Sequence, residues 1–298
     1  NHAVTALVNT GDDTVVNGLH VSPDIDTVIY TLANAIDPER GWGLSDETWV
    51  TMQSHARYVG VRPQHSMAPN DWFNLGDRDM ATHLYRTTRL AEGASLTEVT
   101  REIAQAWNVP YTIVPMTDSR VETRVTLADD ATSPDGHHYQ RGETISFQEY
   151  FVQRRHGVPV TGVEFVGATT AQPTFINNLH TSEAIIIAPS NPIVSLGPIR
   201  ALNGVDATLT FNRDRVVAIS PIVAGSALKG PADRMLVELG HEASVVGVAR
   251  IYAPICSTLV IDQQDEALQS AVEREGMKCV VADTIMRTPQ ITQVLARK

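Results

Sequence analysis

The sequence predicts an α/β protein built on a doubly wound, mostly parallel sheet. The main observation is a series of short, continuously apolar runs at 184–188, 216–219, 258–261 and 278–281. Such runs are typical of parallel strands that are buried on both faces. Helical stretches separate them, and this alternation indicates a Rossmann-like sheet. Residues 46–159 lack the alternation and indicate an insertion of helices and a small antiparallel sheet.

The length and composition fit this organisation. The chain has 298 residues, of which 43% are hydrophobic and 19% are charged, enough for one large or two modest domains. We expect residues 1–45 and 160–298 to form a nucleotide-binding α/β core. Residues 46–159 would then form a subdomain that helps to bind a second ligand.

The charge and the cysteines exclude several classes of protein. A formal net charge of −11 argues against a nucleic-acid groove or an anionic membrane surface as partner. We find no signal peptide and no apolar run of membrane length, so we expect a cytoplasmic protein. Cys256 and Cys279 lie beside or within apolar runs without metal-ligand spacing, which predicts buried thiols.

The first forty residues concentrate acidic side chains. Residues 3–8 are a compact apolar run of strand type, followed by a turn at 9–12 and a helix that begins near Ser22 and Pro23. The stretch 9–27 holds four carboxylates, Asp12, Asp13, Asp24 and Asp26.

These carboxylates allow two interpretations. Acids in a strand-end turn that faces a helix start can hold a hard divalent cation such as Mg²⁺, which prefers oxygen ligands and keeps waters and substrate phosphates in its shell. Alternatively, Asp12 and Asp13 are turn residues and Asp24 caps the helix. The spacing alone does not choose between them.

The middle of the chain predicts three helices and three strands. The helices are expected at 46–58, 77–90 and 95–107, the last opened by a Ser95–Glu98 capping box. The strands are expected at 111–114, 121–127 and 144–147. Asp77 and Asp79 flank Arg78 at the start of the second helix.

From residue 160 onward, helices are expected between the apolar runs. A short strand at 163–166 comes first. The expected helices then lie at 174–181, 231–239, 243–252, 265–275 and 289–297.

Two loops that follow predicted strands are candidate phosphate sites, because ligands of parallel sheets bind beyond the carboxyl ends of the strands. The loop 188–199 carries Ser190, Asn191, Ser195 and Gly197 before a helix expected at Pro198. The loop 220–232 carries Ser220, Pro221 and Lys229 before the next helix. Neither matches a known phosphate-loop pattern, so each is a phosphate site or an ordinary connection. At a third strand end, Asp283 either caps a turn or faces the cleft.

Taken in order, these segments resemble one enzyme family, the 2-phospho-L-lactate transferases of coenzyme F-420 biosynthesis. The resemblance rests on segments that span nearly the whole chain: residues 8–13, 22–27, 42–43, 75–83, 147–149, 189–199, 220–222 and 282–284. The family opens with a strand and a glycine-rich loop that this sequence does not contain, and we expect that loop to precede Asn1 in the full protein.

The resemblance implies a transfer reaction. The donor would be a guanosine diphosphate ester of lactate, enolpyruvate or glycerate. The acceptor would be Fo, a deazaflavin whose terminal ribityl hydroxyl attacks the phosphorus that bears the small acid, so that GMP leaves. Family members use Mg²⁺, and related enzymes form dimers, so we expect a homodimer. The subdomain 46–159 would help to bind the deazaflavin.

Roles for individual residues follow from the resemblance and from the chemistry of phosphoryl transfer, which needs positioning and charge neutralisation. Asp13, Asp24 and Asp26 are expected around the metal and the Fo hydroxyl, with Asp26 as the candidate base. Arg78 would bind phosphate or the small carboxylate, or alternatively form a salt bridge with Asp77 or Asp79.

The remaining expected roles concern the two substrates. The loops Ser190–Gly197 and Ser220–Gly230 would hold GMP or GDP, with Lys229 in the second. Asp24 and Asp77 are expected among the residues that bind ligand. Trp42 would stack on the deazaflavin or pack as a core or lid residue.

Two other classes of function compete with this interpretation. One is a nucleotide-binding regulator of the gluconeogenesis-factor type, which is distantly similar in its strand and loop layout. The other is a metal-dependent phosphohydrolase that uses the same aspartates. The sequence leaves open which small acid is transferred and whether one or two metal ions are bound.

Overall fold

The parallel strands lie in two sheets in the computed structural model, which describes residues 3–63, 72–132, 137–154 and 156–297. One sheet has two strands, β1 (Thr5–Val8) and β4 (Thr112–Pro115). The other has four strands in the order β10-β11-β14-β15, with bounds Ile185–Ile187, Val216–Ile219, Thr258–Asp262 and Lys278–Ala282. The carboxyl ends of β10, β11, β14 and β15 therefore share one edge of their sheet.

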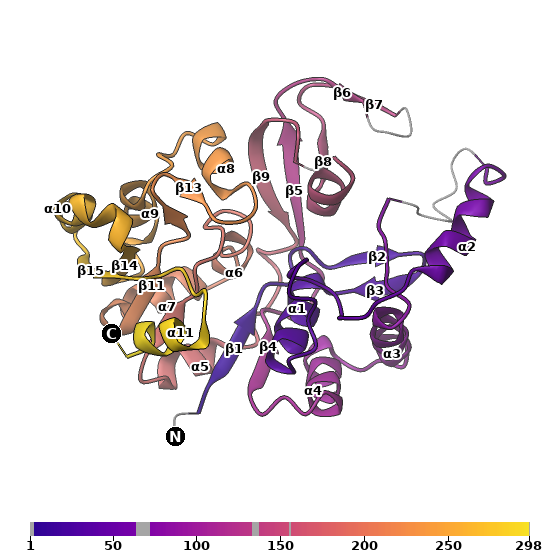
Figure 1. The fold of residues 1–298 in the computed structure, drawn as a ribbon, viewed down its shortest axis with the longest axis horizontal. Helices are drawn as coiled ribbons and strands as arrows, with labels where there is room; N and C mark the ends of the chain where they lie inside the picture. The colour runs from indigo at the N-terminus through magenta and orange to yellow at the C-terminus, as the bar shows by residue number, and fades with distance from the viewer. Residues whose placement is uncertain (1–2, 64–71, 133–136, 155, 298) are drawn as a thin grey trace.

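Helices surround the four-stranded sheet (Figure 1). They are α5 (Ile176–Thr181), α6 (Gly197–Arg200), α7 (Val205–Phe211), α8 (Ala232–Glu238), α9 (Val245–Tyr252), α10 (Gln269–Arg274) and α11 (Pro289–Leu295). The short turns η2 (Arg213–Arg215) and η3 (Gln263–Leu268) are 3₁₀ helices. The largest apolar cluster lies between this sheet and its helices.

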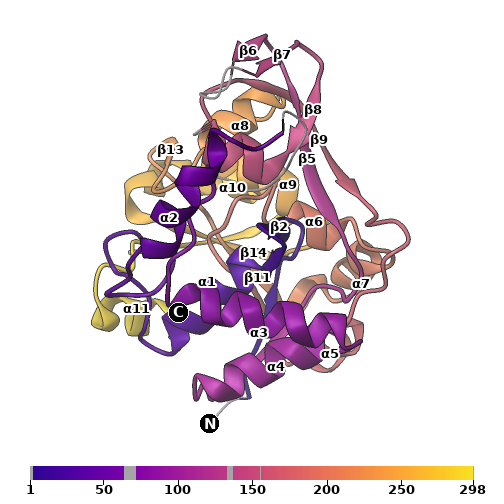
Figure 2. The ribbon, with the colours of Figure 1, turned by 90° about the vertical axis from the view of Figure 1, so that its right-hand side faces the viewer.

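The other half of the molecule is built on β1 and β4 (Figure 1). Figure 2 turns the helical side of this half toward the viewer. Its helices are α1 (Pro23–Leu32), α2 (Val50–Val59), α3 (Asp79–Ala91) and α4 (Leu96–Ala106). A separate apolar cluster joins β1, β4, α1 and α4. Ser95 and Glu98 form the predicted capping box at the start of α4.

Between the two halves stands an antiparallel sheet of order β8-β5-β9, with bounds Thr144–Ser146, Glu122–Leu127 and Val160–Val166. A π-helical turn, η1 (Glu149–Gln153), follows β8. Three hairpins complete the fold: β2-β3 (Thr14–Val16, Leu19–Val21), β6-β7 (Ala131–Thr132, His138–Tyr139) and β12-β13 (Ile222–Val223, Ser226–Ala227).

The structure confirms an α/β fold with parallel sheets. All four apolar runs are parallel strands, and both cysteines are buried, free thiols. Within the described ranges β1-β4 shares no ladder with the four-stranded sheet, so a single doubly wound sheet stays a prediction. Two strands cross the expected domain limits, since β4 pairs with β1 of the core and β9 pairs with β5.

Three local predictions need correction. The helix expected from residue 46 begins only at Val50, and the one expected at 265–275 divides into η3 and α10. The hairpin β2-β3 was missed, although Asn17 and Gly18 both adopt positive φ, as a two-residue hairpin turn requires. No helix in the described part of the chain has both the length and the apolarity needed to cross a membrane.

Candidate functional site

The acidic loop, defined here as residues 9–13, follows β1 and is clamped by its neighbours. The Gly11 backbone N–H donates to Asn9 Oδ1 at 2.8 Å, and its carbonyl accepts the Thr123 N–H at 2.7 Å. A Cβ on Gly11 would lie 2.7 Å from Thr123 Oγ1 and 2.9 Å from Pro198. Only glycine therefore fits, and the loop is held between β5 and the start of α6.

The carboxylates of this region are buried but only partly satisfied. Asp13 Oδ2 accepts the Ser22 hydroxyl at 2.7 Å, and Asp24 Oδ2 accepts the Asn9 amide at 2.9 Å. Asp12 Oδ1 and Asp13 Oδ1 have no hydrogen-bond partner of good geometry among the described residues. Buried carboxylate oxygens without donors are costly, so a positively charged group at this loop would stabilise it.

The interpretation of Asp24 as a helix cap is wrong. Ser22 is the N-cap residue of α1, and neither it nor another described side chain caps that helix. Ser22 donates to Asp13 instead, and Asp24 is tied to Asn9. The turn interpretation is confirmed in part, because the Asp13 N–H donates to the Thr10 carbonyl at 3.2 Å.

Burial raises the pKa of every acid in this group. Burial raises the pKa of Asp13 to about 8, with Asp26 and Asp24 adding repulsion and with Ser22 and Arg86 opposing it. Burial, and then the charge of Asp24, raises the pKa of Asp12 well above its usual value. The pKa of Asp24 is likewise raised by burial. A cation placed among these groups would relieve both burial and repulsion.

Asp26 sits in a second, saturated network beside the acidic loop. Its two carboxylate oxygens accept from Arg86 Nη2 and, at 3.1 Å, from Arg86 Nη1. Arg86 is 1% exposed and Asp26 is 4% exposed, so this is a buried bidentate ion pair. Arg86 Nη1 also donates to the His20 carbonyl at 3.3 Å, which ties α3 to β3 and α1.

The same network continues along α3. His83 Nδ1 lies 3.3 Å from Arg86 Nη1, and His83 Nε2 lies 3.3 Å from Asp79 Oδ2. Asp79 Oδ1 accepts the Tyr30 hydroxyl at 2.5 Å. Burial acts to raise the pKa of Asp79, but His83, Tyr30 and Arg86 outweigh it and the pKa is lowered. Each acid of this network therefore has a donor.

Two places were tested for a divalent cation. Asp26, Asp79 and His83 place one ligand atom each within 4.8 Å of one another. In that set Asp26 is already paired with the Arg86 guanidinium, which supplies the positive charge a metal would bring. The acidic loop offers oxygens without partners, and Mg²⁺ commonly takes only one or two carboxylates with waters and phosphates. The acidic loop with Asp24 is therefore the better fit.

Asp77 and Arg78 form hydrogen bonds at and just before the start of α2 rather than with the acidic loop. Asp77 accepts the Thr48 hydroxyl at 2.6 Å and the Val50 and Thr51 N–H groups at 2.8 and 3.0 Å, so it caps α2 from a distance. These hydrogen bonds lower the pKa of Asp77. The described contact of the Arg78 guanidinium is with the Ser45 carbonyl, at 2.6 Å, and no described ion pair joins it to Asp77 or Asp79.

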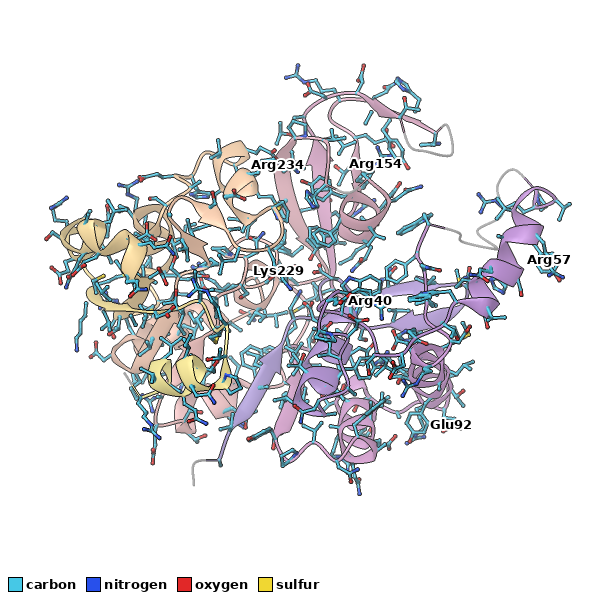
Figure 3. The ribbon with its side chains drawn as sticks, in the orientation of Figure 1. Arg40, Arg57, Glu92, Arg154, Lys229 and Arg234 are labelled. Carbon is cyan, nitrogen blue, oxygen red and sulfur yellow. The ribbon has the colours of Figure 1, made fainter. Side chains whose placement is uncertain are left out.

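The segment Arg40–Trp42 and Lys229 come together from distant parts of the chain, with Gly41 as the point of approach. The Arg40 guanidinium lies 5.2 Å from the Trp42 ring and 4.9 Å from the Trp49 ring, while Trp42 is 51% exposed. A Cβ on Gly41, which has a φ of +75°, would lie 2.9 Å from Lys229 Nζ. Arg40 and Lys229 lie near one another in the middle of the molecule (Figure 3).

In the first candidate phosphate loop the side chains largely hold the loop itself. Asn191 Oδ1 accepts the Ile193 N–H at 2.9 Å, and its carbonyl accepts the Ser195 N–H at 3.1 Å. The Ser190 hydroxyl contacts the Ala188 carbonyl at 3.3 Å. Gly197 opens α6, and a Cβ there would meet Phe165 at 2.7 Å. The contact between Gly11 and Pro198 brings this loop against the acidic loop.

The second candidate loop folds into the hairpin β12-β13. The Ser220 hydroxyl donates to the Ile222 carbonyl at 2.9 Å and accepts the Ile222 N–H at 3.1 Å, and Ser220 is 2% exposed. Ser220 and the buried Pro221 therefore shape the turn. Lys229 is exposed beyond the hairpin, which leaves its ammonium as the accessible charge of this loop.

Sequence reasoning missed several residues of the site. Gln148, which is buried, donates from Nε2 to the Asp12 carbonyl at 3.0 Å, and Asn9 donates to two of the acids. His83 and Gln148 lie inside segments that carried the resemblance, which was the available signal. Arg86 gave no signal, because one arginine in a polar helix is ordinary.

Comparisons with known proteins identify the family of this chain. A family model described as "2-phospho-L-lactate transferase CofD" matches residues 1–297. A phosphoenolpyruvate transferase of Kitasatospora aureofaciens is 37% identical over 297 residues, which cover 99% of this chain and 87% of that protein. A phosphoenolpyruvate transferase of Mycobacterium bovis (strain BCG / Pasteur 1173P2) is 38% identical over 299 residues, covering 100% and 86%.

A solved structure shows the fold alone. The crystal structure of a UPF0052 family member from Bacillus halodurans matches with a TM-score of 0.55 at 11% identity, covering 99% of this chain and 90% of that chain. The family match extends over essentially the whole sequence and includes every segment of the acidic loop, α1 and α3 described above. The resemblance predicted from the motifs is therefore confirmed, and this chain belongs to the 2-phospho-L-lactate transferase CofD family.

Proposed function

We propose that this protein is the transferase of coenzyme F-420 biosynthesis that moves a phospho-acid group from a guanosine diphosphate ester to the terminal ribityl hydroxyl of Fo. The bond between phosphorus and the hydroxyl oxygen forms, the bond to the GMP oxygen breaks, and the hydroxyl proton is lost. The relatives named phosphoenolpyruvate transferases support the enolpyruvyl ester as the donor.

The observation that carries this proposal is the set of buried carboxylate oxygens without donors at the end of β1. Such oxygens fit Mg²⁺, which supplies charge neutralisation of a diphosphate during transfer when it is bound. We propose Asp13 and Asp24 as its ligands, with Asp12 beside them. Asn9, Ser22 and Gln148 hold these acids and their backbone in place.

The geometry changes the role we propose for Asp26. Both of its oxygens accept from Arg86, so a bound metal or a substrate hydroxyl would have to displace a buried bidentate pair. We therefore propose Asp26 as the group that anchors α1 to α3. Asp13 is the better candidate to orient the Fo hydroxyl, because its Oδ1 has no described partner.

The remaining parts of the site stay proposals. The loops 190–197 and 220–230 would hold the guanine nucleotide, with Lys229 near its phosphates. Trp42, exposed next to Gly41, would stack on the deazaflavin, and residues 46–159 would cover it. Arg78 would have to leave the Ser45 carbonyl to reach a substrate. A homodimer stays a prediction.

The test is a product assay. Purified protein with its natural N-terminus is incubated with Fo, Mg²⁺ and each of the enolpyruvyl, lactyl and glyceryl esters of guanosine diphosphate, and products are followed by mass spectrometry. We expect Fo plus one phosphoenolpyruvyl unit, with GMP released in equal amount. Tight binding of GDP without product from any ester would favour a nucleotide-binding regulator, and release of free acid without Fo would favour a phosphohydrolase.

A further inference from the structure

Two asparagine–glycine dipeptides occur in the sequence, Asn17-Gly18 and Asn203-Gly204. In such a dipeptide the glycine nitrogen can attack the side-chain amide of the asparagine, because glycine has no Cβ to crowd the approach and adopts backbone conformations that other residues avoid. Whether this reaction occurs in a folded protein depends on how firmly the structure holds the two residues. The two dipeptides therefore allow a comparison within one chain.

Asn203 and Gly204 form a turn between α6 and α7, among the helices beside the four-stranded sheet (Figure 1). Both residues are exposed. No described hydrogen bond involves the Asn203 side chain or the Gly204 N–H. Gly204 has a φ of +80°, and a Cβ there would meet nothing within 4 Å. The attacking nitrogen and the amide that it attacks are thus both open to water.

Asn17 and Gly18 are held more firmly. They form the two-residue turn of the hairpin β2-β3, next to the paired residues Val16 and Leu19. Asn17 is only partly exposed, and its Nδ2 contacts Met52 Sδ at 3.9 Å. Val16 is buried, which fixes the strand that enters the turn. Ring closure at Asn17 therefore requires this turn to open first.

We propose that Asn203 is a modification site of this protein, at which the side-chain amide is lost through a cyclic imide. The Gly204 nitrogen loses its proton and forms a bond to the amide carbon of Asn203, and the amide nitrogen leaves as ammonia. Water then opens the ring at either carbonyl, which gives aspartate or isoaspartate and adds a negative charge. This inference goes beyond the proposed function and does not depend on which substrate the protein takes.

The neighbours of the dipeptide determine what each product does to the fold. Leu202 is 2% exposed and Val205 is 0% exposed, so buried residues anchor both sides of the turn. The Gly204 carbonyl accepts the Thr208 N–H at 3.0 Å and the Thr208 hydroxyl at 2.8 Å, at the start of α7. Aspartate keeps the length of the backbone and fits between these anchors. Isoaspartate adds a backbone carbon between them, so it should loosen the first turn of α7.

The experiment incubates the full protein in heavy-oxygen water at mildly alkaline pH, where the glycine nitrogen loses its proton more readily. Three forms are compared: the unchanged protein, Asn203→Gln and the matched control Asn17→Gln. Glutamine keeps the amide but closes a larger ring, which forms slowly. Peptide mapping by mass spectrometry measures amide loss, heavy-oxygen uptake and isoaspartate at each position. In the unchanged protein, amide loss should be at least about tenfold faster at Asn203 than at Asn17, because the hairpin must open for the second reaction.

An acidic form should accumulate on ion exchange in the unchanged protein and in Asn17→Gln, but not in Asn203→Gln. Amide loss at Asn203 that is no faster than at Asn17, or an acidic form that persists in Asn203→Gln, would overturn the site. Amide loss at Asn203 without any isoaspartate would overturn the cyclic imide.

The effect on the fold is measured by thermal unfolding of the separated isoaspartate form and of Asn203→Asp, which carries the same charge without the extra backbone carbon. The isoaspartate form should unfold at the lower temperature. Equal unfolding temperatures would overturn the predicted loosening of α7.

Discussion

Two neighbouring groups of buried acids in this protein have opposite surroundings. In the acidic loop, Asp12 and Asp13 each keep an oxygen without a described donor, and burial raises the pKa of both. In the first turn of α1, Asp26 is saturated by the buried Arg86. The same residue type thus serves two purposes, because a buried acid without a partner is poised for a cation and a paired acid holds elements together.

The largest expected effect concerns the paired acid, Asp26. Asp26→Asn leaves the Arg86 guanidinium buried without its counter-charge, which should lower the free energy of unfolding by about 3–5 kcal/mol. Urea unfolding monitored by circular dichroism gives this value. The double variant Asp26→Asn with Arg86→Met should recover much of the loss. If Asp26 were a metal ligand, Asp26→Asn would instead weaken Mg²⁺ binding and leave the stability of the metal-free protein nearly unchanged.

The next effect tests the unpaired side. Asp13→Asn should reduce kcat for transfer to Fo by about 10²–10³-fold, the usual cost of removing one charge-stabilising group. Stability should be retained, because the asparagine oxygen can still accept the Ser22 hydroxyl, so that no buried donor loses its partner. Steady-state kinetics and thermal unfolding of one preparation measure both quantities. Full activity in Asp13→Asn would remove this residue from the site.

The raised pKa values predict how pH and Mg²⁺ act together. In the metal-free protein, Asp12, Asp13 and Asp24 keep their protons in the folded state, whereas in the unfolded state they lose them near pH 4. The free energy of unfolding should therefore fall as pH rises from about 4 toward 8. Mg²⁺ must displace the proton of Asp13, whose pKa is raised to about 8. Its affinity should therefore rise by up to about tenfold per pH unit below pH 8 and then level off.

Thermal unfolding at pH 6 and pH 8, with and without Mg²⁺, measures this linkage. The increase in Tm caused by Mg²⁺ should be larger at pH 8, and Asp13→Asn should remove most of the pH dependence. An equal shift at both pH values would mean that the cation does not meet Asp13.

The smallest expected effect is a control for the comparison between the two groups of acids. Ser95→Ala removes the capping box of α4, away from both acid groups, and should cost about 1 kcal/mol of stability. Transfer activity and Mg²⁺ binding should be unchanged in this variant. A parallel loss of activity would show that the site responds to general destabilisation, and the Asp13 result would then need the same correction.

Much of the fold was readable because local patterns determine local elements. The apolar runs predicted at 184–188, 216–219, 258–261 and 278–281 each contain or overlap a parallel strand, since continuous apolar runs fit strands covered on both faces. The capping box and the Pro198 helix start were equally local. The hairpin at Asn17–Gly18 was also readable from its dipeptide and was overlooked.

The sequence by itself determined the family, most of the order of the strands and helices, and the stretch 9–27 with its four carboxylates. The tertiary structure decided which carboxylates are free. Arg86 lies 60 residues from Asp26 and reaches it only because α3 packs beside α1. Asp77 lies just before α3 in the chain, yet it caps α2. The physical reason is that local propensity depends on near neighbours along the chain, whereas burial and charge pairing depend on which distant elements pack together.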